Sequence, residues 1–206
     1  VLVISTGSAW YTAYTSAEIT AIQSYVSSGG GLLVMGGHMS TPNYAGLVAQ
    51  AFGVTTAMSD FAYDLTFSSF ASHPLFTGCT SIYYRAGGRV GAASPASLVA
   101  WSSGLGTVAV SSRGQGRVVV TGDNTFCSNY YLSTASNQTF ARNIFDWLST
   151  GCPRTYDVYL GATPDSMVQI ATGLTIPQYS PGPLACSTTY YWRVDVTNCC
   201  GTTEGP

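Results

Sequence analysis

Two histidines and a few scattered acids are the residues of this chain whose chemistry could support catalysis. His38, His73 and Asp123, with one of many serines, could supply a base, an orienting acid and a nucleophile. However, no G-x-S-x-G elbow presents a serine. His73 opens the turn HPLFTG, and Asp123 is placed to cap the turn TGDN through its side chain. We therefore predict structural roles for these residues, no catalytic site and no enzyme activity.

Carboxylate oxygens could also form a metal site. Asp60, Asp64 and Asp123 carry the hard ligands that suit calcium, but the spacing of the first two does not follow the D-x-D-x-D-G pattern of a calcium loop. Zinc is disfavoured because the six cysteines show no paired C-x-x-C spacing and only two histidines are present. We predict no metal and no other cofactor.

Three short segments are rich in aromatic residues: YYRAGG, NYYL and AWYTAY. Exposed rings of this kind stack on sugars, and the same residue types are also typical of protein cores and subunit interfaces. Composition alone does not separate a sugar-binding surface from an interface between subunits.

Charged residues make up only 8% of the 206 residues, against about 25% in an ordinary globular domain. A net charge of −2 without a basic cluster argues against nucleic-acid binding. No apolar run reaches the length of a membrane span. A surface so poor in charge needs covering by glycans or a partner chain. The sequon at Asn137 predicts N-glycosylation and, with the cysteines, an extracellular or cell-surface location.

Residues 1–150 alternate between apolar strands and amphipathic helices. VLVIS and LLVMGG are typical of buried strands, and further strands are expected near 97–101, 107–112 and 117–122. Helices are expected from Thr15, whose capping box with Glu18 marks the start, and over 42–53 and 137–149. This alternation predicts an α/β domain with a largely parallel sheet and flanking helices.

The succession SAEITAIQSYVSSGGGLLVMGG, HPLFTG and GQGRVVVTGDNTFCSNYYL, followed by a helix ending in FDWL, resembles the glutamine-amidotransferase-like α/β domain of secreted bacterial proteins. The resemblance covers about 150 residues. It implies a catalytic cysteine on the turn after the second strand, but that turn carries His38 and Met39. The resemblance therefore implies the fold without the activity.

Residues 151–206 have the short alternating strands and turns of a different domain. TYDVYLG and TTYYWRVDV, with MVQIATGL and PQYSPGPL between them, resemble the later half of a bacterial fibronectin type III domain. Such a sandwich needs about seven strands. We therefore expect a partial sandwich that exposes an interface strand, whose apolar positions are Tyr190, Trp192, Val194 and Val196.

The resemblance to a fibronectin domain also bears on the disulfides. It places Cys152 at the same end as Cys199 and Cys200, and Cys186 at the opposite end, about 30 Å away. We expect Cys152 to pair with one of those two, and Cys79 to pair with Cys127. The alternative is that these cysteines are free thiols or join other segments of a longer precursor.

These features predict a non-catalytic extracellular structural protein, a glycosylated homo-polymer that forms a surface filament by strand complementation. The missing strands could come from another subunit or from another part of the precursor. The alternative function is a polysaccharide-binding accessory module of a large secreted enzyme or adhesin.

Overall fold

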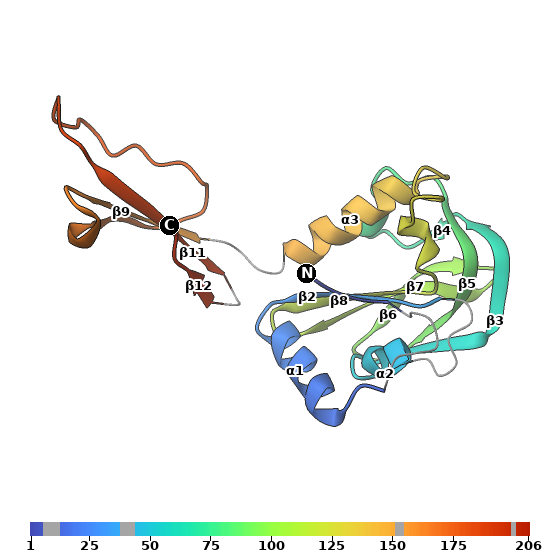
Figure 1. Ribbon diagram of the computed structural model, residues 1–206. Coiled ribbons are helices and arrows are strands. Elements are labelled where there is room, and N and C mark those ends of the chain that lie inside the picture. Colours follow the sequence, from blue (N-terminus) through green and yellow to red (C-terminus); the bar gives the residue numbers. More distant parts are fainter. Residues whose placement is uncertain (6–12, 38–43, 151–154, 199–200) are drawn as a thin grey trace. The chain divides into compact units, whose positions relative to one another are not determined.

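A computed structural model describes residues 1–5, 13–37, 44–150, 155–198 and 201–206 (Figure 1). The chain divides into two compact units, Val1–Gly151 and Cys152–Pro206. No helix in the described ranges has both the length and the apolar character needed to span a membrane.

The first unit is built around a six-stranded mixed sheet (Figure 1). In spatial order its strands are β1 (Leu2–Ser5), β2 (Gly31–Met35), β8 (Gly116–Thr121), β7 (Leu105–Arg113), β6 (Ser97–Ser102) and β4 (Ser69–Phe70). The β1–β2 and β2–β8 pairs are parallel, whereas the three remaining pairs are antiparallel.

The prediction of a largely parallel sheet is therefore wrong, and tight turns explain why. Ser103 and Gly104, which link β6 to β7, have φ values of 50° and 79°, and Gly114 in the turn between β7 and β8 has a φ of 58°. Turns of about two residues with positive φ make antiparallel hairpins, whereas a parallel connection needs a crossover of a dozen residues or more.

A long two-stranded ribbon accompanies this sheet. β3 (Val54–Phe67) pairs antiparallel with β5 (Ile82–Ala92), and the register shifts between Ala57 and Ala62. The inner positions of β5 alternate with its outer positions, so Ile82 and Tyr84 are buried while Tyr83 and Arg85 are not. This ribbon was not predicted from the sequence.

Helices cover both faces of β2 and β8. α1 (Ser16–Ser27) and α2 (Tyr44–Gln50) pack on one face, and α3 (Asn137–Ser149) packs on the other (Figure 1). The predicted capping box of α1 is confirmed, because Thr15 Oγ1 accepts a hydrogen bond from Glu18 N at 3.2 Å and Thr15 N donates to Glu18 Oε2 at 2.7 Å. Two short 3₁₀ helices, η1 (Pro74–Phe76) and η2 (Thr125–Cys127), lie in the loops.

The second unit is one antiparallel sheet of four strands. Its spatial order is β10 (Val168–Leu174), β9 (Thr155–Gly161), β11 (Tyr191–Asn198) and β12 (Gly201–Thr203), with the 3₁₀ helix η3 at Pro164–Ser166. The prediction of a fibronectin-like sandwich is wrong, because the described residues of this unit form one sheet and not two packed sheets. The segment expected as a strand at PQYSPGPL is irregular, and it provides no second layer of strands.

Candidate functional site

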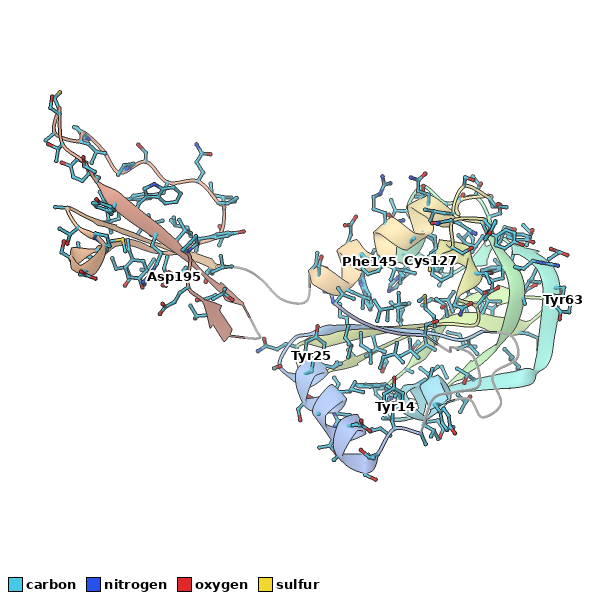
Figure 2. The ribbon with its side chains drawn as sticks, in the orientation of Figure 1. Tyr14, Tyr25, Tyr63, Cys127, Phe145 and Asp195 are labelled. Carbon is cyan, nitrogen blue, oxygen red and sulfur yellow. The ribbon has the colours of Figure 1, made fainter. Side chains whose placement is uncertain are left out.

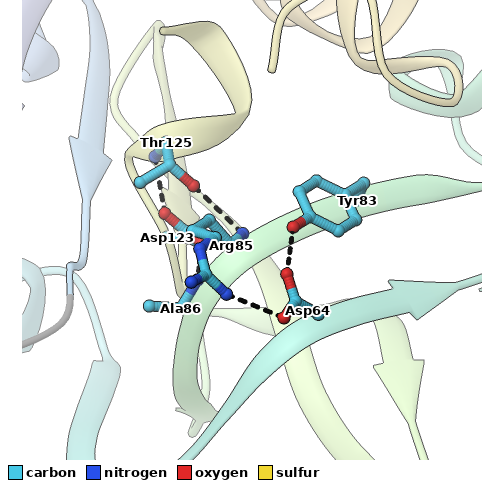
Figure 3. Close-up of polar contacts among 6 residues, drawn as sticks. All are labelled: Asp64, Tyr83, Arg85, Ala86, Asp123 and Thr125. Carbon is cyan, nitrogen blue, oxygen red and sulfur yellow. Dashed lines mark hydrogen bonds and ion pairs between the residues drawn. The ribbon is translucent and has the colours of Figure 1, made fainter. Parts of the chain in front are cut away.

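A buried aspartate ties the loop after β8 to the ribbon (Figure 3). Asp123 is fully buried, and its two carboxylate oxygens accept hydrogen bonds from Ala86 N at 2.9 Å and from Thr125 N at 2.5 Å. Arg85 N in turn donates to Thr125 Oγ1 at 3.1 Å. The bond from Thr125 N confirms the predicted capping role of Asp123. The loop that begins here carries the NYYL segment, so these bonds fix its start against β5.

An ion pair and a phenol hydrogen bond lie on the outer face of the ribbon. Asp64 Oδ2 is 2.7 Å from Arg85 Nη1, and the Tyr83 hydroxyl donates to Asp64 Oδ1 (Figure 3). The hydrogen bond from Tyr83 and the Arg85 charge hold the pKa of Asp64 below its usual range. The same hydrogen bond raises the pKa of Tyr83. Asp64 is therefore ionised and Tyr83 neutral at physiological pH.

The backbone of Asp64 brings a second ring to this pair. Asp64 has a φ of 53°, in the left-handed region that a non-glycine residue seldom occupies. This conformation interrupts the alternation of the strand, and the Tyr63 ring lies under the Arg85 guanidinium at 5.4 Å. The Tyr63 side chain points outward from the ribbon (Figure 2).

Asn137, the predicted glycosylation site, is a buried clamp. Its Oδ1 accepts from Tyr83 N at 2.9 Å, and its Nδ2 donates to Tyr83 O at 2.9 Å and to Tyr131 O at 3.0 Å. Asn137 has no exposed surface. A glycan on Nδ2 would need both solvent access and one of these two hydrogens, so the predicted glycosylation of Asn137 is incompatible with the structure.

The clamp brings two tyrosine-rich segments together. Tyr83 comes from YYRAGG and Tyr131 from NYYL, and their ring centroids lie 5.3 Å apart. The Tyr130 ring follows at 6.5 Å from that of Tyr131 and is 87% exposed. We call this surface the tyrosine platform and define it by six residues: Tyr63, Asp64, Tyr83, Arg85, Tyr130 and Tyr131. Of the third aromatic segment, AWYTAY, the structure describes only Ala13 and Tyr14. Tyr14 packs against the core beside α1 and α2.

His73 has the structural role that the sequence predicts. It is the N-cap of η1, where its Nδ1 accepts a hydrogen bond from Leu75 N at 3.3 Å. Its ring packs edge-on against Trp147, at 5.0 Å between centroids, and Arg117 lies over the same indole. Partial burial and the Arg117 charge lower the pKa of His73. His38 lies outside the described residues, as does the side chain of Asp60.

The remaining residues considered for a metal site are already engaged. Asp64 is paired with Arg85, and both oxygens of Asp123 accept backbone N–H groups. Among the residues that the structure describes, no group of three or more His, Cys, Asp and Glu residues could hold a metal ion.

Three of the six cysteines lie in described segments, and all three are free thiols: Cys79, Cys127 and Cys186. The expected bond between Cys79 and Cys127 is therefore absent. Cys127 Sγ lies 3.6 Å from Met35 Sδ and donates to Asn124 O at 3.3 Å, and burial raises the pKa of Cys79 and Cys127. The other disulfide candidates lie outside the described residues: Cys152, Cys199 and Cys200.

The sheet of the second unit has one polar and one apolar face. On the polar face Arg193 Nε is 2.8 Å from Asp195 Oδ1, and the guanidinium lies 4.6 Å from the centre of the Tyr159 ring. The apolar face carries three cross-strand pairs: Trp192 with Leu160, Val194 with Val158, and Val196 with Tyr156.

A groove of about 470 Å³ lies between this apolar face and the irregular segment that precedes β11. Its lining is almost entirely apolar and includes all four predicted interface residues: Tyr190, Trp192, Val194 and Val196. The groove is not closed, since Trp192 remains 67% exposed. The structure thus places these residues together on one incompletely covered surface.

The pairing of β11 is uneven along its length. β9 pairs with all residues from Tyr191 to Thr197, whereas β12 pairs only with Val196–Asn198. Beyond β12, Gly205 N donates to Asp195 Oδ1 at 3.2 Å. Within the described part of the chain, no strand pairs with Tyr191–Arg193 on the side opposite β9.

A family model described as a domain of unknown function, DUF4350, matches residues 5–145. The chain belongs to the DUF4350 family. The DUF4350 region includes every residue of the tyrosine platform and the Asn137 clamp, and it ends before the four-stranded sheet. No curated protein matches the sequence.

Several solved structures are similar in fold to about two thirds of this chain. The mmIFT52 N-terminal domain has a TM-score of 0.57 and 21% identity, covering 66% of this chain and 72% of that one. Two cytoplasmic proteins of Salmonella typhimurium each have a TM-score of 0.51. STM1381 from strain LT2 has 18% sequence identity, and the match covers 63% of this chain and 60% of that one. STM3548 has 17% sequence identity, and the match covers 71% of this chain and 70% of that one.

These findings correct the resemblance inferred from the sequence. The family that matches is DUF4350 and not a glutamine amidotransferase, and the sheet is mixed. The fibronectin type III resemblance also fails, because the second unit has one sheet where a sandwich has two. Short runs of alternating apolar residues indicate strands but not how the strands are arranged, so they do not identify a family.

Proposed function

We propose that this protein is a non-catalytic extracellular structural protein whose copies join head to tail into a filament by β-strand addition. The observation that carries the proposal is the uneven pairing of β11. Tyr191–Arg193 pair with a strand on one side only, next to an apolar groove that leaves Trp192 exposed. An added strand would satisfy this edge through backbone hydrogen bonds, and its alternate side chains would enter the groove.

A second copy of the chain is the partner that the exposed surfaces favour. β1 is an edge strand of the six-stranded sheet, and its apolar residues Leu2 and Val3 are exposed, as is Val1 just before it. Joining β1 of one copy to β11 of the next uses two different surfaces. Such a heterologous contact extends into a filament unless its rotation closes a ring.

The composition supports the same proposal. With 8% charged residues and a net charge of −2, copies repel one another weakly. The proposed extracellular location rests on the six cysteines, three of which lie outside the described residues. Glycosylation of Asn137 forms no part of the proposal because that side chain is buried. The engagement of His73 and Asp123 in capping supports a non-catalytic role for the DUF4350 region.

The test uses two variants that block opposite ends of the contact. A lysine on an edge strand prevents strand addition, so Val3→Lys should block β1 and Trp192→Lys should block the β11 edge. Val168→Lys is the matched control, because Val168 is an equally exposed apolar residue on β10, the other edge of the small sheet.

Light scattering coupled to size-exclusion chromatography then gives the mass of each species. The proposal predicts that the unmodified chain and Val168→Lys polymerise, that each blocked variant alone is monomeric, and that the two blocked variants mixed together form a one-to-one dimer. A monomeric unmodified chain would contradict the proposal, and so would a mixture of blocked variants that stays monomeric.

A further inference from the structure

The tyrosine platform is an exposed aromatic surface that strand addition leaves unused. Tyr130 is 87% exposed and Tyr63 is 53% exposed. Tyr63 lies under the guanidinium of the Asp64–Arg85 pair, and Tyr130 lies beside the Tyr131 ring. Exposed tyrosines that are spread singly over a surface need no explanation. Four tyrosines gathered around one ion pair form a surface with both flat apolar faces and polar groups.

The platform is held in place by buried hydrogen bonds. Asp123 fixes the loop after β8 to Ala86 of β5 and caps Thr125 within that loop, and Asn137 joins the backbones of Tyr83 and Tyr131. The Asp64–Tyr83 and Asp64–Arg85 contacts orient the polar groups at the surface (Figure 3). A surface that is already ordered loses little conformational entropy when a ligand binds, so weak stacking contacts can produce measurable affinity.

The charges of the platform identify the kind of ligand. Its acid and its base neutralise each other at 2.7 Å, and the platform carries no further charged group. The platform therefore attracts neither an anion nor a cation. Asp64 retains acceptor capacity on its exposed carboxylate, and the Arg85 guanidinium and the tyrosine hydroxyls offer donors.

We propose that the tyrosine platform binds the pyranose rings of a neutral polysaccharide. The apolar face of a pyranose stacks on a phenol ring, as tyrosine combines a flat apolar body with a polar tip. Hydroxyl groups at the rim of the same sugar donate to Asp64 and accept from Arg85. The ring centroids of Tyr83, Tyr131 and Tyr130 follow one another at 5.3 and 6.5 Å, so the aromatic surface extends beyond a single ring, with Tyr130 as its most exposed member.

Affinity electrophoresis in native gels tests this site on the full chain carrying Val3→Lys, which the proposed function makes monomeric and which serves as the unmodified chain in this comparison. The probes are a soluble β-1,3-glucan, a β-1,4-glucan, a galactomannan and a xylan, with alginate as the anionic comparison. Tyr130→Ala removes the most exposed ring, and Tyr130→Phe keeps the ring without its hydroxyl. Phe145→Ala is the matched control, because Phe145 is an exposed aromatic residue on α3 outside the platform.

We expect at least one neutral polysaccharide to retard the chain. Tyr130→Ala should weaken that retardation about five-fold, the loss of one stacking contact, whereas Tyr130→Phe and Phe145→Ala should leave it within about two-fold of the unmodified chain. Three outcomes would overturn the proposal: no retardation by any neutral probe, stronger retardation by alginate than by all of them, or an equal loss in Tyr130→Ala and Phe145→Ala.

Discussion

The side-chain amide of Asn137 pairs with the backbone of Tyr83 through two hydrogen bonds, one in each direction, both 2.9 Å long. The amide therefore bonds the backbone of Tyr83 in β5 as a residue of a neighbouring strand would. Its remaining hydrogen is donated to Tyr131 O, which attaches the NYYL segment to the same strand. Because the Asn137 side chain is buried, its amide is not open to water as an alternative partner.

Replacing Asn137 should destabilise the DUF4350 region strongly. Asn137→Ala leaves Tyr83 N–H, Tyr83 C=O and Tyr131 C=O without their side-chain partner, and we expect the free energy of unfolding to fall by about 2–4 kcal/mol. Urea unfolding followed by circular dichroism measures this change. Asn129→Ala, at an exposed position in the same loop, should change the free energy by less than about 0.5 kcal/mol. Equal effects of the two substitutions would refute the clamp.

The sequon at Asn137 should stay unoccupied even in a host that glycosylates secreted proteins. The oligosaccharide would have to displace a buried hydrogen bond from Nδ2. Peptide mass spectrometry of the secreted, folded chain should find Asn137 unmodified, and Thr139→Ala, which destroys the sequon, should not change the intact mass beyond the substitution itself. A glycan on Asn137 in folded protein would show that the structure around the clamp is wrong.

His73 should make the fold less stable in mild acid. Its pKa in the folded state lies below the ordinary value of 6.5, so the unfolded chain binds the proton more readily. The stability associated with neutral His73 is therefore complete above about pH 6.5 and is lost as the pH falls towards the folded-state pKa. Melting temperatures measured from pH 7.5 downwards give the effect.

His73→Asn separates this titration from the capping role. An asparagine at the N-cap still accepts a hydrogen bond from Leu75 N but does not titrate. The loss of melting temperature between pH 7 and pH 5 should therefore be smaller in His73→Asn than in the unmodified chain. Identical pH profiles would mean that another group causes the acid sensitivity.

Of the described thiols, Cys186 should react first. It is exposed, whereas Cys79 and Cys127 are partly buried and burial raises their pKa, which lowers the fraction of reactive thiolate. Alkylation of the native chain at pH 8, with peptide mapping over time, should modify Cys186 about ten-fold faster than the other two. A disulfide-linked peptide that contains both Cys79 and Cys127 would contradict the structure.

Local sequence signals predicted the elements better than their arrangement. The capping box at Thr15 and Glu18 located α1, and the apolar runs located β1, β2 and β8. Hairpin turns at Ser103–Gly104 and Gly114 make the β6–β7 and β7–β8 pairs antiparallel, and their glycines were available as a signal. The ribbon of β3 and β5 was missed because its polar and apolar residues do not alternate regularly along the sequence. The register shift between Ala57 and Ala62 interrupts the pairing of the two strands.

The candidate site depended on contacts that no local pattern records. YYRAGG and NYYL were recognised as aromatic segments, but only the fold shows that Tyr83 and Tyr131 meet. Asn137 carried a sequon, which says nothing about burial, and the bonds that define its role reach back 54 and 6 residues. In the second unit the alternation of Trp192, Val194 and Val196 correctly placed them on one face, because a strand has a period of two.

Electron cryo-microscopy of the assembled protein tests the central proposal most directly, because it resolves which strand lies beside Tyr191–Arg193. The proposal predicts a repeating filament in which β1 of the neighbouring copy pairs with this edge and places apolar side chains next to Trp192. Single copies with this edge open to solvent would contradict it, as would a filament in which the subunits meet elsewhere and the groove stays uncovered.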